Sequence, residues 1–403
     1  MKIALISDIH FGKNSRTDEL SVPGEPIDEK TSGGISLKKG LIELLKAEGV
    51  EYIFLAGDLT SCGTPQEYYY CERFLLELAE NLNLPQDHIL CAAGNHDIDR
   101  NISKLSNCFE NSNEDVKNII VRKYQNIAAN ASCLNLDKIP VINDGVAPFS
   151  GIYEADEFIV FVLNSSILCS HSQDIPHGKI TTEQLTWFED SCEKYKNDKR
   201  TKILLMHHHP INYQYPYPSL DVSTIEEGSE LINICGNNGI NIVMHGHRHH
   251  PTAVTKNETG WKNPITFICA GSLSVNAKQR DNGEIPNTIH IIDMQYAPEK
   301  ILLYNYKYTS AEGWGPIKSS TPQAPLNKQM YLGKIYSEQE INEALKIFNV
   351  DKQLFSWEEL PEELKFMNVD KLNDIIKERQ ANKIISGKFP DEKVFISTLE
   401  GIQ

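Results

Sequence analysis

The pattern of hydrophobic and polar residues along positions 1–300 shows two periodicities. Short apolar or β-branched runs of strand length recur, and several are separated by stretches in which apolar residues return every three to four positions. Strands that alternate with helices are typical of layered α/β folds, so the pattern predicts that fold class. The predicted strands span 2–7, 52–56, 88–93, 158–163, 202–206, 241–244, 265–270 and 288–293, and the clearest predicted helices span 37–46, 65–82, 182–195 and 225–235.

Three segments depart from this pattern. Residues 14–36 are polar and rich in Gly, Pro and charge, which predicts either a loop over a site or a plain surface insertion. Residues 100–145 mix Asn-rich sequence with a helical pattern and are interpreted as a cap or rim insertion. From about residue 310 the strand pattern stops. We therefore predict one domain over 1–309, followed over 310–403 by a linker and a small helical C-terminal region.

Composition narrows the class of protein. With 40% apolar and 23% charged residues the chain has a globular composition, which excludes collagen-like and wholly disordered proteins. A net charge of −16 argues against a protein whose main task is binding the phosphates of duplex nucleic acid. The nine scattered cysteines contain no C-x-x-C pair and are expected to be reduced thiols. Because no apolar run has the length of a signal core or a membrane span, we expect a soluble, cytoplasmic protein.

Five clusters of metal-favouring residues follow the predicted strands in chain order. Asp-x-His and His-x-His place two ligands on one side of an extended segment, because side chains alternate with period two. A single histidine is more often an ordinary core or surface residue, but five ordered clusters favour a metal site. The clusters are Asp8 with His10; Gly57 with Asp58; Gly94, Asn95, His96 and Asp97; His208 with Pro210; and Gly246, His247 and His249.

This ordered set resembles the calcineurin-like metallophosphoesterases over about residues 1–305. The resemblance implies a four-layer αββα sandwich that carries a binuclear metal centre. His96 would then face the substrate, as general acid or as stabiliser of the leaving oxygen, and Asp97 would orient it. The implied ligands of one metal are Asp8, His10, Asp58 and His249, and those of the other are Asp58, Asn95, His208 and His247.

The run of three histidines at 207–209 is ambiguous, and His208 is chosen because the family pattern places the ligand two residues before the proline. His207 and His209 are expected to point elsewhere. Carboxylate, amide and imidazole ligands suit divalent manganese or iron, which we favour, and also zinc or nickel. The resemblance implies that a hydroxide bridging two such ions attacks a phosphoester in line.

The sequence pattern of residues 57–68 indicates which class of phosphoester the protein hydrolyses. They lack the Asp-Arg pair of the Ser/Thr phosphoprotein phosphatases of this fold. Their pattern Gly-Asp-Leu-x-x-x-Gly-x-x-x-Glu-Tyr, together with residues 177–187, is similar to the bacterial class III cyclic-nucleotide phosphodiesterases. We therefore interpret the chain as a phosphodiesterase for a cyclic nucleotide or another small diester.

Two alternatives stay open. A metal-dependent DNA or RNA nuclease would use the basic cluster at 117–123 and the tyrosines between 213 and 217 as a stacking surface. A scaffold protein of this fold would bind a partner protein, or a second copy of itself, through the C-terminal helices. No membrane partner is expected.

Overall fold

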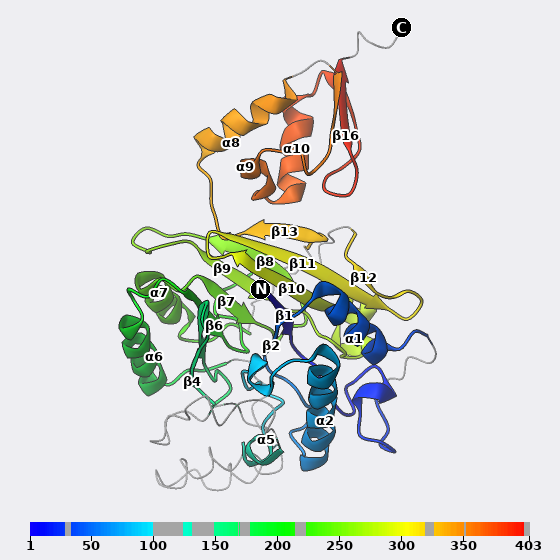
Figure 1. Cartoon of the computed structure of the whole chain (residues 1–403), viewed down its shortest axis with the longest axis vertical. Helices are drawn as coiled ribbons and strands as arrows, with labels where there is room; N and C mark the ends of the chain where they lie inside the picture. Colours follow the sequence, from blue (N-terminus) through cyan, green and yellow to red (C-terminus); the bar gives the residue numbers. More distant parts are fainter. Residues whose placement is uncertain are drawn as a thin grey trace.

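The computed structural model describes residues 1–28, 34–99, 124–130, 149–167, 169, 178–213, 223–318, 326–349 and 352–398. Along the chain, a large α/β unit is followed by a smaller C-terminal unit, which lies at one end of the molecule (Figure 1). None of the described helices is both long enough and apolar enough to cross a membrane.

The first sheet of the large unit has seven strands. Its β1, β2 and β3 are parallel, and β10, β11 and β12 continue the sheet in antiparallel fashion from β1, while β13 pairs with β11. The strands are β1 (Lys2–Ile6), β2 (Tyr52–Leu55), β3 (Ile89–Cys91), β10 (Asn287–Tyr296), β11 (Lys300–Thr309), β12 (Gly313–Pro316) and β13 (Gln329–Leu332).

The second sheet has six strands in the order β4-β5-β6-β7-β9-β8. Its centre, from β5 to β9, is parallel, and the two outer strands are antiparallel to their neighbours. The strands are β4 (Gly151–Glu154), β5 (Phe158–Val162), β6 (Thr201–Leu205), β7 (Ile242–His245), β8 (Thr252–Lys256) and β9 (Ile265–Cys269).

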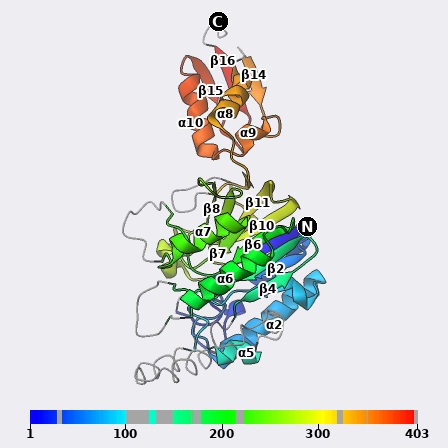
Figure 2. The ribbon, with the colours of Figure 1, turned by 90° about the vertical axis from the view of Figure 1, so that its left-hand side faces the viewer.

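Helices cover the outer face of each sheet, so the large unit is the predicted four-layer αββα sandwich (Figures 1 and 2). Alternate residues of β5 separate the two cores: Val160 and Val162 join the core shared with the first sheet, whereas Phe161 joins the core beneath α6 and α7. The helices are α1 (Leu37–Glu48) and α2 (Pro65–Leu82) on the first sheet and α6 (Thr182–Lys194) and α7 (Gly228–Asn238) on the second.

The predicted helix starts are explained by capping. The hydroxyl of Thr64 accepts from the amide of Glu67, whose carboxylate accepts from the Thr64 amide, and Pro65 occupies the first turn of α2. Thr181 and Gln184 form the same box at the start of α6. The described 3-10 helices are η1 (Asp18–Leu20), η2 (Gln86–His88), η4 (Ala277–Gln279), η5 (Asp281–Gly283) and η6 (Leu345–Phe348).

The C-terminal unit differs from the helical region predicted from sequence. It contains an antiparallel sheet in the order β14-β16-β15, and a separate apolar core that includes Phe348, Phe355 and Leu364. Strands of four or five residues are too short to give a clear alternation in the sequence. The elements are α8 (Glu338–Ala344), β14 (Lys352–Phe355), α9 (Glu362–Lys365), α10 (Val369–Arg379), β15 (Lys383–Ser386) and β16 (Val394–Thr398).

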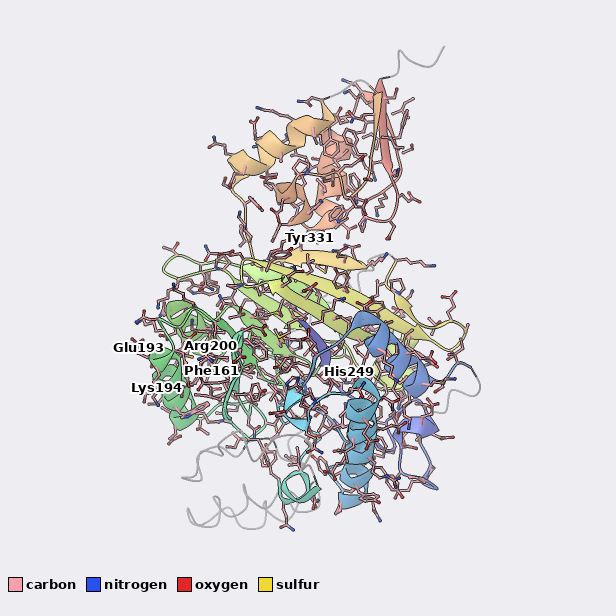
Figure 3. The ribbon with its side chains drawn as sticks, in the orientation of Figure 1. Phe161, Glu193, Lys194, Arg200, His249 and Tyr331 are labelled. Carbon is pink, nitrogen blue, oxygen red and sulfur yellow. The ribbon has the colours of Figure 1, made fainter. Side chains whose placement is uncertain are left out.

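The structure also moves the boundary of the large unit. Both β12 and β13 pair with β11, so the first sheet runs beyond residue 309 to Leu332. Within β13, Tyr331 packs against Trp357 and Phe366 of the C-terminal unit, and Figure 3 shows Tyr331 between the two units.

Several sequence expectations fall partly outside the described residues. Of the predicted cap at 100–145 the structure describes 124–130, which contains α5 (Gln125–Asn130). There Asn126 donates to the Gly63 carbonyl at 2.8 Å, so this short piece lies against the loop that follows β2. The segments 29–33, 117–123 and 214–217 lie outside the described residues.

Candidate metal centre

The candidate ligands converge from the carboxyl ends of strands in both sheets. Residues after β1, β2 and β3 meet residues after β6 and β7, because the parallel strands of the two facing sheets end at the same edge of the sandwich. Figure 3 shows one of them, His249, inside the large unit. The converging side chains are Asp8, His10, Asp58, Asn95, His96, His207, His247 and His249.

The backbone at five of these positions adopts a conformation that is uncommon outside glycine. The φ angles are 51° at Asp8, 49° at His10, 52° at Asp58, 84° at His247 and 59° at His249. Such angles cost on the order of 1–3 kcal/mol each and persist only where surrounding contacts impose them. Here the Asp8 amide donates to the Gly57 carbonyl at 3.1 Å, and the His10 amide donates to the Asp58 carbonyl at 3.0 Å.

Two glycines of the motifs are needed for close approach. A Cβ on Gly94 would collide with the amide and carboxylate of Asp58. A Cβ on Gly246 would collide with the hydroxyl of Ser7 and lie 2.6 Å from Asp8 Oδ2. These glycines therefore allow the loops after β3 and β7 to pack directly against the carboxylates of Asp58 and Asp8.

One group of side chains surrounds Asp8. The His249 Nε2 atom lies 3.2 Å from Asp8 Oδ1, and His10 Nε2 lies 3.7 Å from the same oxygen and 3.4 Å from Asp58 Oδ2. Two ligand atoms bound to one ion at about 2.0–2.2 Å are themselves about 3.0–3.5 Å apart. The spacing of this group is therefore close to that of a metal site.

A second group lies on the other side of Asp58. His207 Nε2 is 3.3 Å from Asp58 Oδ2 and 3.1 Å from Asn95 Oδ1, and His247 Nδ1 is 3.1 Å from the same Asn95 oxygen. Asp58 Oδ2 thus faces His10 of the first group and His207 of the second. A carboxylate in this position is suited to bridge two ions.

Backbone carbonyls orient three of the imidazoles. The Nδ1 atoms of His207, His249 and His96 face the carbonyl oxygens of residues 56, 279 and 61 at 2.7, 2.9 and 2.9 Å. Because a carbonyl oxygen only accepts, each Nδ1 carries the hydrogen. Nε2 is then the ring nitrogen whose lone pair binds a metal ion or a proton.

Unsatisfied buried atoms test whether the residues fit metal ions. Asp8 Oδ1 and both ring nitrogens of His10 are buried without a hydrogen-bond partner. Leaving such groups unpaired costs about 1–3 kcal/mol each and more for a charged group. A divalent cation would satisfy Asp8 Oδ1 and one His10 nitrogen together, so the side chains fit the binuclear centre that the family resemblance implies.

The electrostatics of the cluster also suit cations. Burial alone would raise the pKa values of Asp8 and Asp58, but the adjacent imidazoles outweigh it and hold both well below the usual range. Burial would lower the pKa of His207, yet the charge of Asp58 raises it to about 9. A divalent ion at this position therefore competes with a proton on His207.

The structure corrects the expectation for His207, which does not point away from the site. It is His207 that makes the described contacts with Asp58 and Asn95. His208 has its Nδ1 2.9 Å from the Ser165 hydroxyl, and its Nε2 is buried without a hydrogen-bond partner. Its side chain lies in a group with His207 and His247. Sequence alone could not separate the two neighbours, because turns after β6 interrupt the alternation of side chains.

Asp97 contacts the loops around the site. Its carboxylate accepts from the amides of Thr60 and Gly94 at 3.1 and 2.9 Å, so it ties the loop after β2 to the loop after β3. Burial and the nearby charge of Asp58 raise the pKa of Asp97 to about 7. The ring of His96, which Asp97 was expected to orient, has the Ser61 carbonyl as its described hydrogen-bond partner.

The Gly-x-x-x-Glu-Tyr part of the 57–68 pattern has a structural role. Glu67 accepts from the amides of Cys62 and Thr64 at 3.0 Å, and the Tyr68 hydroxyl donates to the Asp97 carbonyl at 2.7 Å. Gly63 has a φ of 68°, and a Cβ there would collide with the carbonyl of Ile98. These residues shape the loop that carries Asp58.

Comparison with known proteins gives one family match. The model of a family described as "Calcineurin-like phosphoesterase" matches residues 1–251. No curated protein matches the chain.

The solved structures that match this chain include three phosphoesterases. A dimetal phosphatase from Danio rerio has 10% identity and a TM-score of 0.46, over 82% of this chain and 98% of that chain. A purple acid phosphatase from yellow lupin, Lupinus luteus, has 14% identity and a TM-score of 0.49, over 78% and 52%. The phosphoesterase Yfce from E. coli has 13% identity and a TM-score of 0.29, over 75% and 92%. At these values the likenesses add nothing to an argument about substrate.

Proposed function

The chain belongs to the calcineurin-like phosphoesterase family, and we propose that within this family it is a binuclear metal-dependent phosphodiesterase acting on a cyclic nucleotide or another small diester. The observation that carries the proposal is the position of Asp58, whose Oδ2 faces His10 at 3.4 Å and His207 at 3.3 Å. A single carboxylate shared by two ligand groups is the requirement for a paired metal site.

We assign the two sets of ligands as follows. Asp58 belongs to both sets. The Ala56 carbonyl orients the His207 ring through Nδ1, and we assign His207 Nε2 as the ligand in place of the His208 expected from the sequence. Two divalent ions in these sets would supply a hydroxide nucleophile at neutral pH and neutralise charge on the phosphoryl oxygens. Manganese or iron is our proposed metal, because the donors are carboxylate, amide and imidazole. One set is Asp8, His10, Asp58 and His249, and the other is Asp58, Asn95, His207 and His247.

His96 is proposed as the proton donor to the leaving oxygen. It is half-buried, and its ring centroid lies 4.5 Å from that of the buried His10, so it stands at the accessible side of the ligands. The Ser61 carbonyl accepts a hydrogen bond from its Nδ1, so Nε2 is the nitrogen that would carry the transferred proton. Its amide donates to Asp58 Oδ1 at 2.7 Å, so the same residue also fixes the shared carboxylate.

The preference for a diester rests on the resemblance of residues 57–68 to the class III phosphodiesterases. Electrostatics are compatible with it, since two divalent ions and the carboxylates of Asp8 and Asp58 leave a net charge of about +2. That charge attracts a diester, which carries one negative charge. The Ser/Thr phosphatase pattern is missing from this segment.

The proposal is tested by metal content and substrate preference. Protein purified without chelator is analysed for metals, and hydrolysis of bis(p-nitrophenyl) phosphate, p-nitrophenyl phosphate and 2′,3′- and 3′,5′-cyclic nucleotides is measured with added Mn²⁺. We expect at least two metals per chain and faster turnover of diesters than of the monoester. Faster turnover of the monoester would refute the diester assignment, and metal-dependent cleavage of single-stranded DNA or RNA alone would favour a nuclease.

The assignment of His207 gives a separate prediction. His207→Ala should weaken binding of the second metal more than about 100-fold, because a ligand is lost, whereas His208→Ala should weaken it by about 100-fold or less. Mn²⁺ titration followed by calorimetry measures both variants against the unchanged chain. If His208→Ala loses the second metal and His207→Ala keeps it, the ligand is His208.

A further inference from the structure

A third group of metal-favouring side chains lies beside the binuclear site. His209 follows β6, His245 is the last residue of β7 and Cys269 is the last residue of β9. His245 and Cys269 are register partners in the parallel β7–β9 pair, so strand pairing brings them side by side. All three residues are fully buried.

The spacing of the group is that of metal ligands. Cys269 Sγ lies 3.5 Å from His209 Nε2, and the rings of His209 and His245 have centroids 4.7 Å apart. One ligand atom from each of the three residues lies within 4.8 Å of the others. A tetrahedral ion with a sulfur ligand at about 2.3 Å and a nitrogen ligand at about 2.0–2.1 Å holds those two atoms about 3.5 Å apart.

An unsatisfied nitrogen gives independent support. The hydroxyl of Tyr213 lies 2.7 Å from His245 Nε2, so that ring nitrogen is already paired. The other nitrogen, His245 Nδ1, is buried without a hydrogen-bond partner. When Nε2 donates its hydrogen to the phenol oxygen, Nδ1 carries the lone pair that a metal ion requires.

We propose that His209, His245 and Cys269 bind a third divalent ion, of the zinc type. Two imidazoles and a thiolate favour Zn²⁺, whereas the binuclear ligand sets contain only oxygen and nitrogen donors. A water molecule would complete the tetrahedron, because the Tyr213 hydroxyl is paired with His245 Nε2 on the other side of the ring. Binding releases the thiol proton, so the site has a net charge of about +1.

This third ion would lie close to the reaction centre without joining it. The ring centroids of His209 and His247 are 6.3 Å apart, and His245 precedes His247 by two residues. Binding would therefore fix the turn after β7 that presents His247 and His249. The inference does not rest on the proposed activity, because the cobalt–thiolate band reports this site alone; the expected count of three metals rests on the proposed binuclear centre.

Cobalt substitution tests the third site in the intact protein. A thiolate bound to Co²⁺ gives an intense charge-transfer band in the near ultraviolet, which oxygen and nitrogen ligands do not give. We expect wild-type protein titrated with Co²⁺ to show this band, and elemental analysis after loading with Zn²⁺ to give three metals per chain. Cys269→Ser should lose the band and one metal, and should keep the other two.

Cys235→Ser is the matched control, because Cys235 is equally buried but lies in α7. It should keep both the band and the third metal. Two metals per chain and no thiolate band in wild-type protein would overturn the proposal and leave a hydrogen-bonded Cys269–His209 pair. Persistence of the band in Cys269→Ser would also overturn it. Because the wild-type spectrum is decisive, the test stands even if the variant does not fold.

Discussion

Asp58→Ala is expected to abolish pairing of the two metals and nearly all turnover. The substitution removes Asp58 Oδ2, which faces both His10 and His207. Among the described contacts, no other side-chain oxygen faces both rings. The substitution also removes the acceptor for the His96 amide, so the proposed proton donor loses an anchor. A metal pair supplies several kcal/mol of transition-state stabilisation, and at about 1.4 kcal/mol per tenfold the expected loss in kcat is about 10³- to 10⁵-fold.

Metal analysis and steady-state kinetics measure this effect, and circular dichroism checks the fold. Asp156→Ala is a suitable control, because Asp156 is an exposed carboxylate in the turn between β4 and β5. Asp58→Asn keeps the size of the side chain and should show a similar loss if charge and bridging matter. An Asp58→Ala protein that still holds two metals and turns over substrate at the wild-type rate is incompatible with a bridging role.

His96→Ala is expected to lower kcat by about 10²- to 10⁴-fold while both metals stay bound. The ring interacts with Ser61 through Nδ1, whereas the contact with Asp58 is made by the His96 backbone amide, which alanine retains. Turnover and metal binding should therefore separate in this variant. The loss should be smaller for a substrate whose leaving group is p-nitrophenolate, since a good leaving group needs little protonation.

His88→Ala provides the comparison, because His88 stacks on Tyr52 near the start of β3 and lies at the opposite end of that strand from His96. Its kinetics should match those of the wild type. Native kcat in His96→Ala would refute the acid assignment. Loss of metal from the same variant would instead make His96 a ligand.

The large unit was predictable because its apolar strand runs and helix patterns are clear and recur along the sequence. The eight predicted strands correspond to β1, β2, β3, β5, β6, β7, β9 and β10, and the capped helix over 65–82 begins and ends where predicted. Central strands of a parallel sheet are buried on both faces, so they appear as continuous apolar runs. Edge strands carry weaker signals, and β8, with every residue half-buried, was missed for this reason.

The site was predictable in composition but less so in detail. Metal-favouring residues after successive strands indicated Asp8, Asp58 and His249 without any geometry. The distinction between His207 and His208 depends on how the backbone turns after β6, and the histidines themselves carry no signal of that turn. The third group was invisible for a different reason: Cys269 lies far along the sequence from His209, and only the β7–β9 pairing brings it beside His245.

The left-handed backbone at the candidate ligands limits how the metal preference of this protein can be redesigned. Changing a metal site usually means exchanging donors, for example Asp for Glu or His for Cys. At Asp8, His10, Asp58 and His249 the φ angles lie between 49° and 59°, a region that Asp, Asn and His enter far more readily than other side chains. An exchange there has to satisfy the ion and the main chain together. Asn95 and His207 are absent from the positive-φ positions, so laboratory evolution of a new metal specificity should find its first accepted substitutions there.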